Sequence, residues 1–481
     1  MFLGIDIGTS AVKAALIDET GKLTGEASVS LQVSRPQPLW SEQHPEDWWA
    51  AADKAVRALS DEHRRSVQAI GLAGQMHGAT LLDARDRPLR PAILWNDGRS
   101  EDECRELERA EPRSRELTAN MAFPGFTAPK LQWLRKHEAD LFAATNTVLL
   151  PKDYVRLRMT GDKATDASDA SGTLWLDIAN RRWSDEMLDA CGLSRRHMPQ
   201  LFEGTEITST LRADVANAWG MDQVPVAAGA GDNAAAAIGA GVVADGDAFI
   251  SLGTSGVAFV ATDSLRADPD NGLHAFCHAL PGRWHQMSVM LSAAASLDWA
   301  ANLLCMDVAG LVDCAKRASP SATPIFLPYL TGERTPHADP HAKAVFFGMT
   351  ASTDSPELAR SVLDGVAMGM RDGLDMIVRA GSQVDRFTVV GGGWRSGYWG
   401  KLIAGALGRP LVYREGGAVG PALGAARLAQ IACGEGTVQG SCAPLAAIDT
   451  IEPDAETADY FADRQPRFRA LYATLKNQFR D

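Results

Sequence analysis

Apolar residues recur along the chain with two different spacings, which predict strands in some segments and helices in others. Short and nearly continuous apolar runs are typical of buried strands. They occur at Phe2–Ile7, 67–73, 91–94, 224–228, 249–252 and Phe387–Val390. Apolar residues three or four positions apart predict helices at 45–59, 234–240, 356–380, 396–407 and 421–432. Because strand and helix patterns alternate, we predict an α/β fold.

The opening pattern of the chain returns near its middle. The sequence Gly-Thr-Ser at 8–10 separates strand patterns at 2–7 and 12–17, and the same three residues at 253–255 separate patterns at 249–252 and 257–260. An internal repeat at this separation predicts two domains built on one plan. We place the boundary near residue 242, which gives an amino-terminal domain over 1–241 and a carboxy-terminal domain over 242–481.

Composition narrows the classes of function. The 481 residues are 46% hydrophobic and carry a formal net charge of -13, so the surface does not attract a nucleic-acid backbone or an anionic membrane. The seven cysteines are scattered without metal-ligand or redox spacing, which is typical of reduced thiols. No apolar stretch reaches the ~18 residues of a membrane span. The first apolar run already carries the charge of Asp6, which argues against a secretory signal. We therefore expect a cytoplasmic protein.

The first hairpin has the residues of a phosphate-binding turn. Gly8 allows a tight turn, the hydroxyl and amide groups of Thr9 and Ser10 are donors for phosphate oxygens, and Lys13 adds a charge. Asp6, at the end of the strand, suits Mg²⁺ held through water. The alternative reading is an ordinary tight turn with an exposed aspartate.

Two further loops complete a predicted ATP site. A nucleotide between two domains needs hydrogen-bond donors on both sides. Gly253 and Thr254 in the second hairpin would bind the phosphates from the side of the second domain. Gly391, Gly392 and Gly393 leave no Cβ atoms, so a flat base and ribose can approach the backbone. No Walker loop or dinucleotide fingerprint is present in the sequence. The alternatives are a coincidental repeat and a simple glycine-rich loop.

Asp232 is the candidate catalytic base. It follows a predicted strand and a glycine turn, at the start of a small-residue helix. The helix N-terminus stabilises its anion by about 0.3–1 kcal/mol, and phosphoryl transfer through a loose transition state needs only a weak base. The predicted Mg²⁺ would lie between Asp232 and Asp6, through water. The alternative reading is a helix cap, a position that aspartate often takes.

Polar and aromatic side chains beside glycine turns are candidate sugar contacts. Gln75 and His77 follow the strand predicted at 67–73, and Trp95 and Asn96 follow the strand predicted at 91–94. Each pair also has a structural reading: His77 fits a hydrogen-bonded core histidine, and 95–98 fits an Asn-Asp-Gly turn with a packing tryptophan.

With these loops in place, the chain resembles the FGGY family of carbohydrate kinases, relatives of actin, hexokinase and the heat-shock chaperone ATPases. One family signature fits 344–349 followed by 357–364, and the other fits 125–127 with 130–134 and 136–137. The likeness runs from Phe2 to about Arg427. It implies two actin-like, ribonuclease H-like ATPase domains with a cleft between them, and ATP and Mg²⁺ as cofactors.

Within the family, the residues are most similar to members that phosphorylate D-xylulose. The similar stretches are 38–43, 74–80, 93–99, 150–154, 231–233 and 332–336. The resemblance implies transfer of the ATP γ-phosphoryl group to O5, with Asp232 as base and Asp6 near the phosphates. It implies Met76, His77 and Asn233 as sugar contacts. Glycerol is disfavoured, because glycerol kinases carry Arg-Glu where this chain has Met76 and His77.

Three alternatives remain open at this point. The protein could phosphorylate another ketose or polyol such as ribulose, respond to sugar without catalysis, or hydrolyse ATP on a protein partner. The resemblance also implies a homodimer as an expectation.

Overall fold

The computed structural model describes residues 1–391, 396–415 and 420–480. A large mixed sheet is built from the first half of the chain, in the order β13-β14-β5-β1-β2-β3, with β15 also paired to β5. Its central strands β1, β5, β14 and β15 are parallel where they pair, and β2 runs antiparallel to β1. The strands are β1 (Phe2–Ile7), β2 (Ala11–Ile17), β3 (Leu23–Ser30), β5 (Ala69–Gly74), β13 (Ile207–Thr210), β14 (Pro225–Ala227) and β15 (Ala230–Gly231).

A second large sheet repeats this plan in the other half of the chain. Its order is β18-β19-β17-β16-β22-β23-β24. The hairpin of β16 and β17 is antiparallel and β22 is parallel to β16, as β2 and β5 are to β1. The strands are β16 (Ala248–Leu252), β17 (Gly256–Thr262), β18 (His274–Cys277), β19 (Trp284–Met290), β22 (Phe387–Val390), β23 (Leu411–Arg414) and β24 (Ala447–Ile451).

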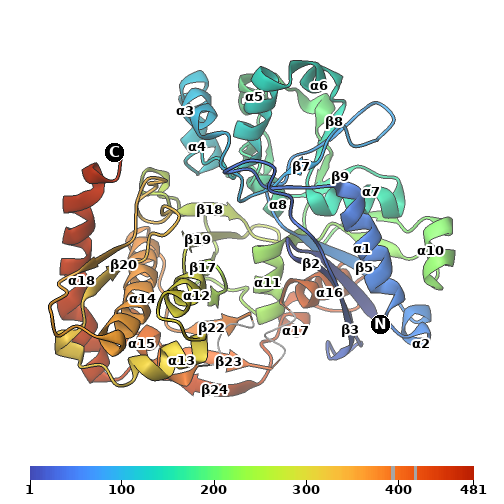
Figure 1. The fold of residues 1–481 in the computed structure, drawn as a ribbon. Helices are drawn as coiled ribbons and strands as arrows, with labels where there is room; N and C mark the ends of the chain where they lie inside the picture. The colour runs from blue at the N-terminus through green and yellow to red at the C-terminus, as the bar shows by residue number, and fades with distance from the viewer. Residues whose placement is uncertain (392–395, 416–419, 481) are drawn as a thin grey trace.

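Two small-residue helices, α11 (Asp232–Ala240) and α16 (Gly420–Ala432), lie between the sheets (Figure 1). α16 packs on β1 and β5, although it comes from the second half of the chain. A Cβ atom on Gly4 would lie 1.9 Å from the Ala422 carbonyl oxygen, and one on Gly71 would lie 1.9 Å from that of Ala425. This close approach requires glycine at both positions of the sheet. On its other side α11 packs against Phe249 of the second sheet.

Three long helices cover the outer faces of the two sheets. α1 (Pro45–Arg57) and α7 (Pro151–Thr160) cover the first sheet, and α14 (Ser355–Arg379) covers the second. In α1, His44 accepts a hydrogen bond from the Glu46 amide and Pro45 occupies the first turn, which fixes the start of the helix. Its apolar stripe, including the fully buried Trp48, faces β2 and β3.

The remaining elements surround the two large sheets or connect their strands. The short strands are β4 (Glu42–Gln43), β6 (Thr80–Leu82), β7 (Ala92–Ile93), β8 (Thr147–Leu149), β9 (Ala164–Asp166), β10 (Leu176–Asp177), β11 (Arg182–Trp183), β12 (Gln200–Phe202), β20 (Ile325–Leu327) and β21 (Val345–Phe347). The helices are α2 (Asp61–Arg65), α3 (Glu101–Ala110), α4 (Ser114–Thr118), α5 (Thr127–His137), α6 (Ala139–Ala144), α8 (Ala167–Ser171), α9 (Asp185–Ala190), α10 (Ala213–Trp219), α12 (Ala294–Leu303), α13 (Val308–Ala315), α15 (Gly397–Leu407), α17 (Val438–Ser441) and α18 (Ala455–Leu475).

The predicted boundary near residue 242 falls in the sequence between the last strand of the first sheet and the first strand of the second. The boundary remains a prediction. Helix α16 belongs to the second half of the sequence but packs on the sheet of the first half. In the part of the chain that the structure describes, no single helix is long and apolar enough to cross a membrane. α12 and α13 reach that threshold only as a pair, and they are bent by 88°.

Candidate active site

The carboxyl ends of three parallel strands bring the candidate carboxylates together. Ile7 on β1 is in register with Gly74 on β5, and Gly74 is in register with Gly231 on β15. Asp6 therefore lies at the same edge of the sheet as Asp232, which directly follows β15. The negative charge of Asp232 contributes to a raised pKa of Asp6, as expected of neighbouring carboxylates.

Asp6 has the environment of a cation ligand. It is only 6% exposed, and its Oδ1 has no hydrogen-bond partner among the residues that the structure describes. Burial and then the charge of Asp232 raise its pKa to about 7, while Lys13, its partner across the β1–β2 hairpin, lowers it. A buried carboxylate oxygen without a donor fits a hydrated Mg²⁺.

Asp232 is half-buried and is the first residue of α11. Its Oδ1 accepts hydrogen bonds from the Asn233 backbone amide at 2.7 Å and from Asn233 Nδ2 at 2.9 Å. Burial raises the pKa of Asp232 to about 6, and the two bonds from Asn233 oppose that rise. No hydrogen bond to Oδ2 is found within the described parts of the chain. One oxygen thus satisfies the helix start, and the other remains an acceptor.

The side chains of Gln75 and Trp95 hold the first hairpin. Thr9 Oγ1 donates to Gln75 Oε1 at 2.9 Å, and Trp95 Nε1 donates to Thr9 Oγ1 at 2.9 Å. Gln75 Nε2 donates to Gln43 Oε1 at 3.0 Å, which also accepts from Trp48 Nε1. Gln43 Nε2 closes the network at 2.7 Å from the Thr9 carbonyl oxygen. Gln43 and Trp48 were not among the site residues expected from the sequence.

His77 is buried and neutral, with one ring nitrogen used by the fold. Its Nδ1 lies 2.7 Å from the Gly172 carbonyl oxygen, so we assign the proton to Nδ1, because a carbonyl oxygen can only accept. Burial, followed by the charge of Lys130, lowers the pKa of His77 to about 3. Nε2 is then an acceptor. Met76 lies beside the turn that precedes Asp232: a Cβ atom on Gly231 would be 3.1 Å from its sulfur.

Asn96 lies in an exposed turn. Its neighbour Asp97 is buried and accepts hydrogen bonds from the Ser41 amide at 2.6 Å and from the Arg99 guanidinium at 2.7 Å. Asp97 therefore stabilises an Asn-Asp-Gly turn, which is the structural alternative given for 95–98. The Asn96 side chain is exposed on that turn.

The phosphate-loop candidates lie at strand ends of both sheets. Gly8 closes the first turn by donating to the Ala11 carbonyl oxygen at 3.1 Å, and Ser10 and Lys13 are exposed. Gly253 and Thr254 are also exposed. Their carbonyl oxygens accept from backbone amides at the start of α12, at 2.9–3.3 Å, which anchors that loop. Gly391 is exposed, with φ +88°, directly after β22, and Gly392 and Gly393 lie outside the described residues.

A buried ionic cluster reaches the turn that carries Asp232. Lys152 Nζ lies 2.6 Å from Asp153 and 2.9 Å from each of Asp166 and Asp169, and all four side chains are fully buried. Ser168 Oγ donates to Asp166 and accepts from the Gly231 amide at 3.1 Å. Lys152 had no site role among the expectations from the sequence. The available signal was the pair Asp166 and Asp169 within the small-residue segment 164–171.

Comparisons with known proteins agree with the predicted family. Residues 1–239 match the N-terminal domain of the FGGY family of carbohydrate kinases, and residues 248–433 match its C-terminal domain. The chain is 54% identical to the xylulose kinase of Escherichia coli (strain K12) over 479 residues, which cover 99% of both chains. It is 51% identical to the xylulose kinase of Klebsiella pneumoniae over 480 residues, again covering 99% of both.

Solved structures support the same assignment. The structure of a "xyloylose kinase" from Brucella ovis has a TM-score of 0.95 at 47% identity and covers 99% of both chains. The xylulose kinase from Rhodospirillum rubrum has a TM-score of 0.91 at 29% identity over 100% of both chains. The predicted pair of actin-like domains is confirmed by these neighbours. On both domain matches and full-length similarity, this chain belongs to the FGGY family of carbohydrate kinases.

Proposed function

We propose that the protein transfers the γ-phosphoryl group of ATP to O5 of D-xylulose, giving D-xylulose 5-phosphate and ADP. The observation that carries the proposal is the pair of carboxylates at one sheet edge, in which Asp232 Oδ2 remains an acceptor beside the buried Asp6. The identity of the sugar rests on full-length similarity to proteins named xylulose kinase.

Asp232 would act as the general base. O5 forms a bond to the γ-phosphorus, the bond from that phosphorus to the β,γ-bridging oxygen breaks, and the O5 proton passes to Asp232 Oδ2. Because phosphoryl transfer has a loose transition state, orientation of the hydroxyl matters more than base strength. The hydrogen bonds from Asn233 fix the carboxylate for that purpose. Asp6 and Asp232 would hold Mg²⁺ through water, and bound Mg²⁺ would neutralise charge on the phosphates.

The nucleotide would be held from both sheets. The Thr9 hydroxyl already bonds Gln75 and Trp95. We therefore propose that Thr9 contacts the phosphate through its backbone amide. Gly8, Ser10 and Lys13 would complete the first loop. From the second sheet we propose Gly253, Thr254 and Gly391, with Gly392 and Gly393 beyond the described residues.

The sugar would lie beside the base, against Met76 and His77. With its Nδ1 proton committed to Gly172, His77 would accept a hydrogen bond from a sugar hydroxyl at Nε2. Asn96 and Asn233 remain proposed polar contacts. Gln75 and Trp95 would act on the sugar site indirectly, by fixing the Thr9 hairpin.

Release of ADP with a panel of acceptors tests the proposal. D-xylulose should give the highest kcat/KM, above D-ribulose, glycerol and other polyols, and ADP release should depend on added sugar. A clear preference for another acceptor would reassign the substrate. Sugar-independent ADP release, or none with any sugar, would remove the kinase assignment for this chain.

The pH dependence of activity should follow the carboxylate pair. Because the pKa values of Asp232 and Asp6 are raised to about 6 and about 7, both groups are increasingly protonated as pH falls through this range. A protonated base cannot accept the O5 proton, so kcat/KM should fall below about pH 6–7. Initial rates between pH 5 and 8.5 provide the measurement. A flat profile down to pH 5 would contradict the raised pKa values in the working enzyme.

Substituting Ser168 should separate positioning from folding. Ser168→Ala removes the acceptor for the Gly231 amide, next to Asp232. An unpaired buried amide costs about 1–3 kcal/mol, and part of that cost should appear as a misplaced base, with kcat lowered about tenfold. The KM for ATP should not change, and Ser168→Thr, which restores a hydroxyl, should recover part of kcat. A change in thermal stability with unchanged kcat would make the contact purely structural.

A further inference from the structure

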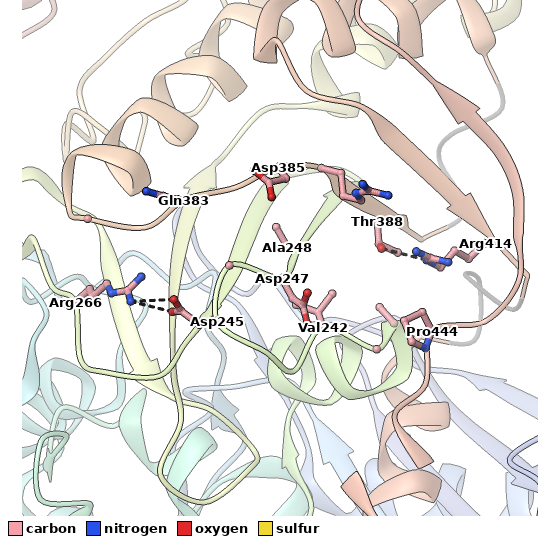
Figure 2. A pocket seen from close by; sticks show the side chains of 15 residues that line it. Val242, Asp245, Asp247, Ala248, Arg266, Gln383, Asp385, Thr388, Arg414 and Pro444 are labelled. Carbon is pink, nitrogen blue, oxygen red and sulfur yellow. Dashed lines mark hydrogen bonds and ion pairs between the residues drawn. The ribbon is translucent and has the colours of Figure 1, made fainter. Parts of the chain in front are cut away.

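A cavity of about 550 Å³ lies away from the candidate active site. Its lining comes from the end of α11, the following loop over 241–247, the first residues of β16 and β22, and side chains from neighbouring segments (Figure 2). The proposed phosphate loops lie at the opposite ends of β16 and β22. At about 3.3 Å per residue, the five residues of β16 separate the two places by about 16 Å. The cavity is therefore distinct from the proposed nucleotide loops.

One side of the cavity contains an arginine that is already paired. Arg266 pairs with Asp245 at 2.9 Å and with Asp263 at 3.1 Å, and it also donates to Ser382 Oγ at 3.2 Å. Figure 2 shows the Arg266–Asp245 pair at one end of the cavity. Asp247 Oδ2 accepts two backbone amides of its own loop, at 2.7 and 3.2 Å. Arg266 therefore has little capacity left for a ligand, and the charge of Asp247 acts on the arginine at the other side, Arg414.

The other side contains two arginines without a carboxylate partner. Neither Arg386 nor Arg414 makes an ion pair with any residue in the described parts of the chain. Arg414 is fixed by hydrogen bonds from Nε to Thr388 Oγ1 at 3.3 Å and from Nη1 to the Leu445 carbonyl oxygen at 2.9 Å. Burial, and then the charge of Arg386, lower the pKa of Arg414, while Asp247 opposes this. The two guanidinium groups therefore repel each other across the cavity wall.

A fixed guanidinium beside a second one without an ion pair offers the donors that a phosphoryl group requires. Arginine donors match the spacing of phosphate oxygens, and an anion between the two groups would remove their repulsion. Gln383 and Asp385, which are exposed along the same wall (Figure 2), offer acceptors for hydroxyl groups. The cavity volume lies in the usual range for small-molecule sites.

We propose that this cavity binds a small phosphate monoester that carries hydroxyl groups, as a sugar phosphate does, with the phosphoryl group on Arg386 and Arg414. The site is coupled to catalysis through α11, which begins at Asp232 and ends at Ala240 in the cavity wall. The binding site itself does not depend on which sugar the enzyme phosphorylates.

Calorimetric titration with D-ribose 5-phosphate and, separately, inorganic phosphate tests the site, with saturating ADP present to occupy the nucleotide loops. D-ribose 5-phosphate should bind, and more tightly than inorganic phosphate. Arg386→Ala removes an exposed side chain and should weaken its binding at least tenfold, whereas Arg85→Ala, an exposed arginine of the other lobe, should leave it unchanged.

Equal affinities in wild type and Arg386→Ala, or no binding to wild type, would overturn the site. Equal affinities for the sugar phosphate and inorganic phosphate would overturn recognition of the hydroxyl groups. Coupling through α11 predicts that D-ribose 5-phosphate changes kcat at least twofold in wild type and not in Arg386→Ala, and an unchanged kcat in wild type would overturn it. The titrations need no turnover, so their failure is distinct from failure of the proposed kinase reaction.

Discussion

Asp232→Asn is expected to lower kcat by about 10²–10⁴, the usual contribution of a general base, while nucleotide binding is retained. Asparagine keeps the shape of the side chain, and its amide oxygen can still accept the two hydrogen bonds from Asn233. It cannot take the proton of O5. Steady-state ADP production with D-xylulose measures the loss, and titration with ADP checks that the nucleotide loops remain intact.

Asp47→Asn is a matched control for this experiment. Asp47 is an exposed acid in the first turn of α1, as Asp232 is in the first turn of α11, but it lies outside the candidate site. The control should keep wild-type kcat. Near-wild-type turnover in Asp232→Asn would remove Asp232 from the role of base, because no other change in the variant compensates for the missing carboxylate.

Lys152→Met is expected to destabilise the protein by about 3–5 kcal/mol, the cost of breaking a buried ion pair. Burial alone lowers the pKa of Lys152, but the charges of Asp153, Asp166 and Asp169 outweigh it and raise the pKa. Without the ammonium group these carboxylates have lost their common cation in the buried interior. Thermal unfolding of wild type and variant in parallel measures the difference. The deficit should shrink as the pH falls, because protonation neutralises the carboxylates that remain.

Two variants define the mechanism of that loss. Asp169→Asn keeps the shape of the side chain and leaves Lys152 paired with Asp153 and Asp166, so it should cost far less than Lys152→Met. Lys22→Met, at an exposed lysine, should leave the unfolding transition unchanged. If Asp169→Asn is as damaging as Lys152→Met, shape and hydrogen bonding, rather than charge balance, hold the cluster together.

Most of the helices and strands could be predicted, because the spacing of apolar residues within each segment is sufficient to indicate its type. β1 and β22 begin and end at the predicted residues, and α14 and α16 lie within one residue of the predicted ranges. In these segments apolar periodicity and buried faces coincide. The proximity of Asp6 and Asp232 also follows from the sequence, since both residues lie at or after the carboxyl ends of predicted strands, and parallel strands place those ends at one edge.

Hydrogen-bond partners could not be predicted in the same way. Gln75 was a candidate sugar contact because it is polar and follows a strand, but the sequence did not indicate that its amide bonds Thr9 and Gln43. A flexible polar side chain has many possible partners, and only the tertiary arrangement selects among them. The contact of Gly4 with α16 was likewise hidden, because a glycine within a strand gives no indication of which distant segment approaches it.

That contact has a consequence for the order in which the molecule can be completed. Strand β1 is among the first segments to leave the ribosome, but helix α16, which covers it, is translated more than 400 residues later. At about 5–20 residues per second this is a delay of about 20–80 seconds. During synthesis the nascent amino-terminal lobe therefore presents a bare, glycine-lined sheet face, and its final packing step waits for nearly the whole polypeptide.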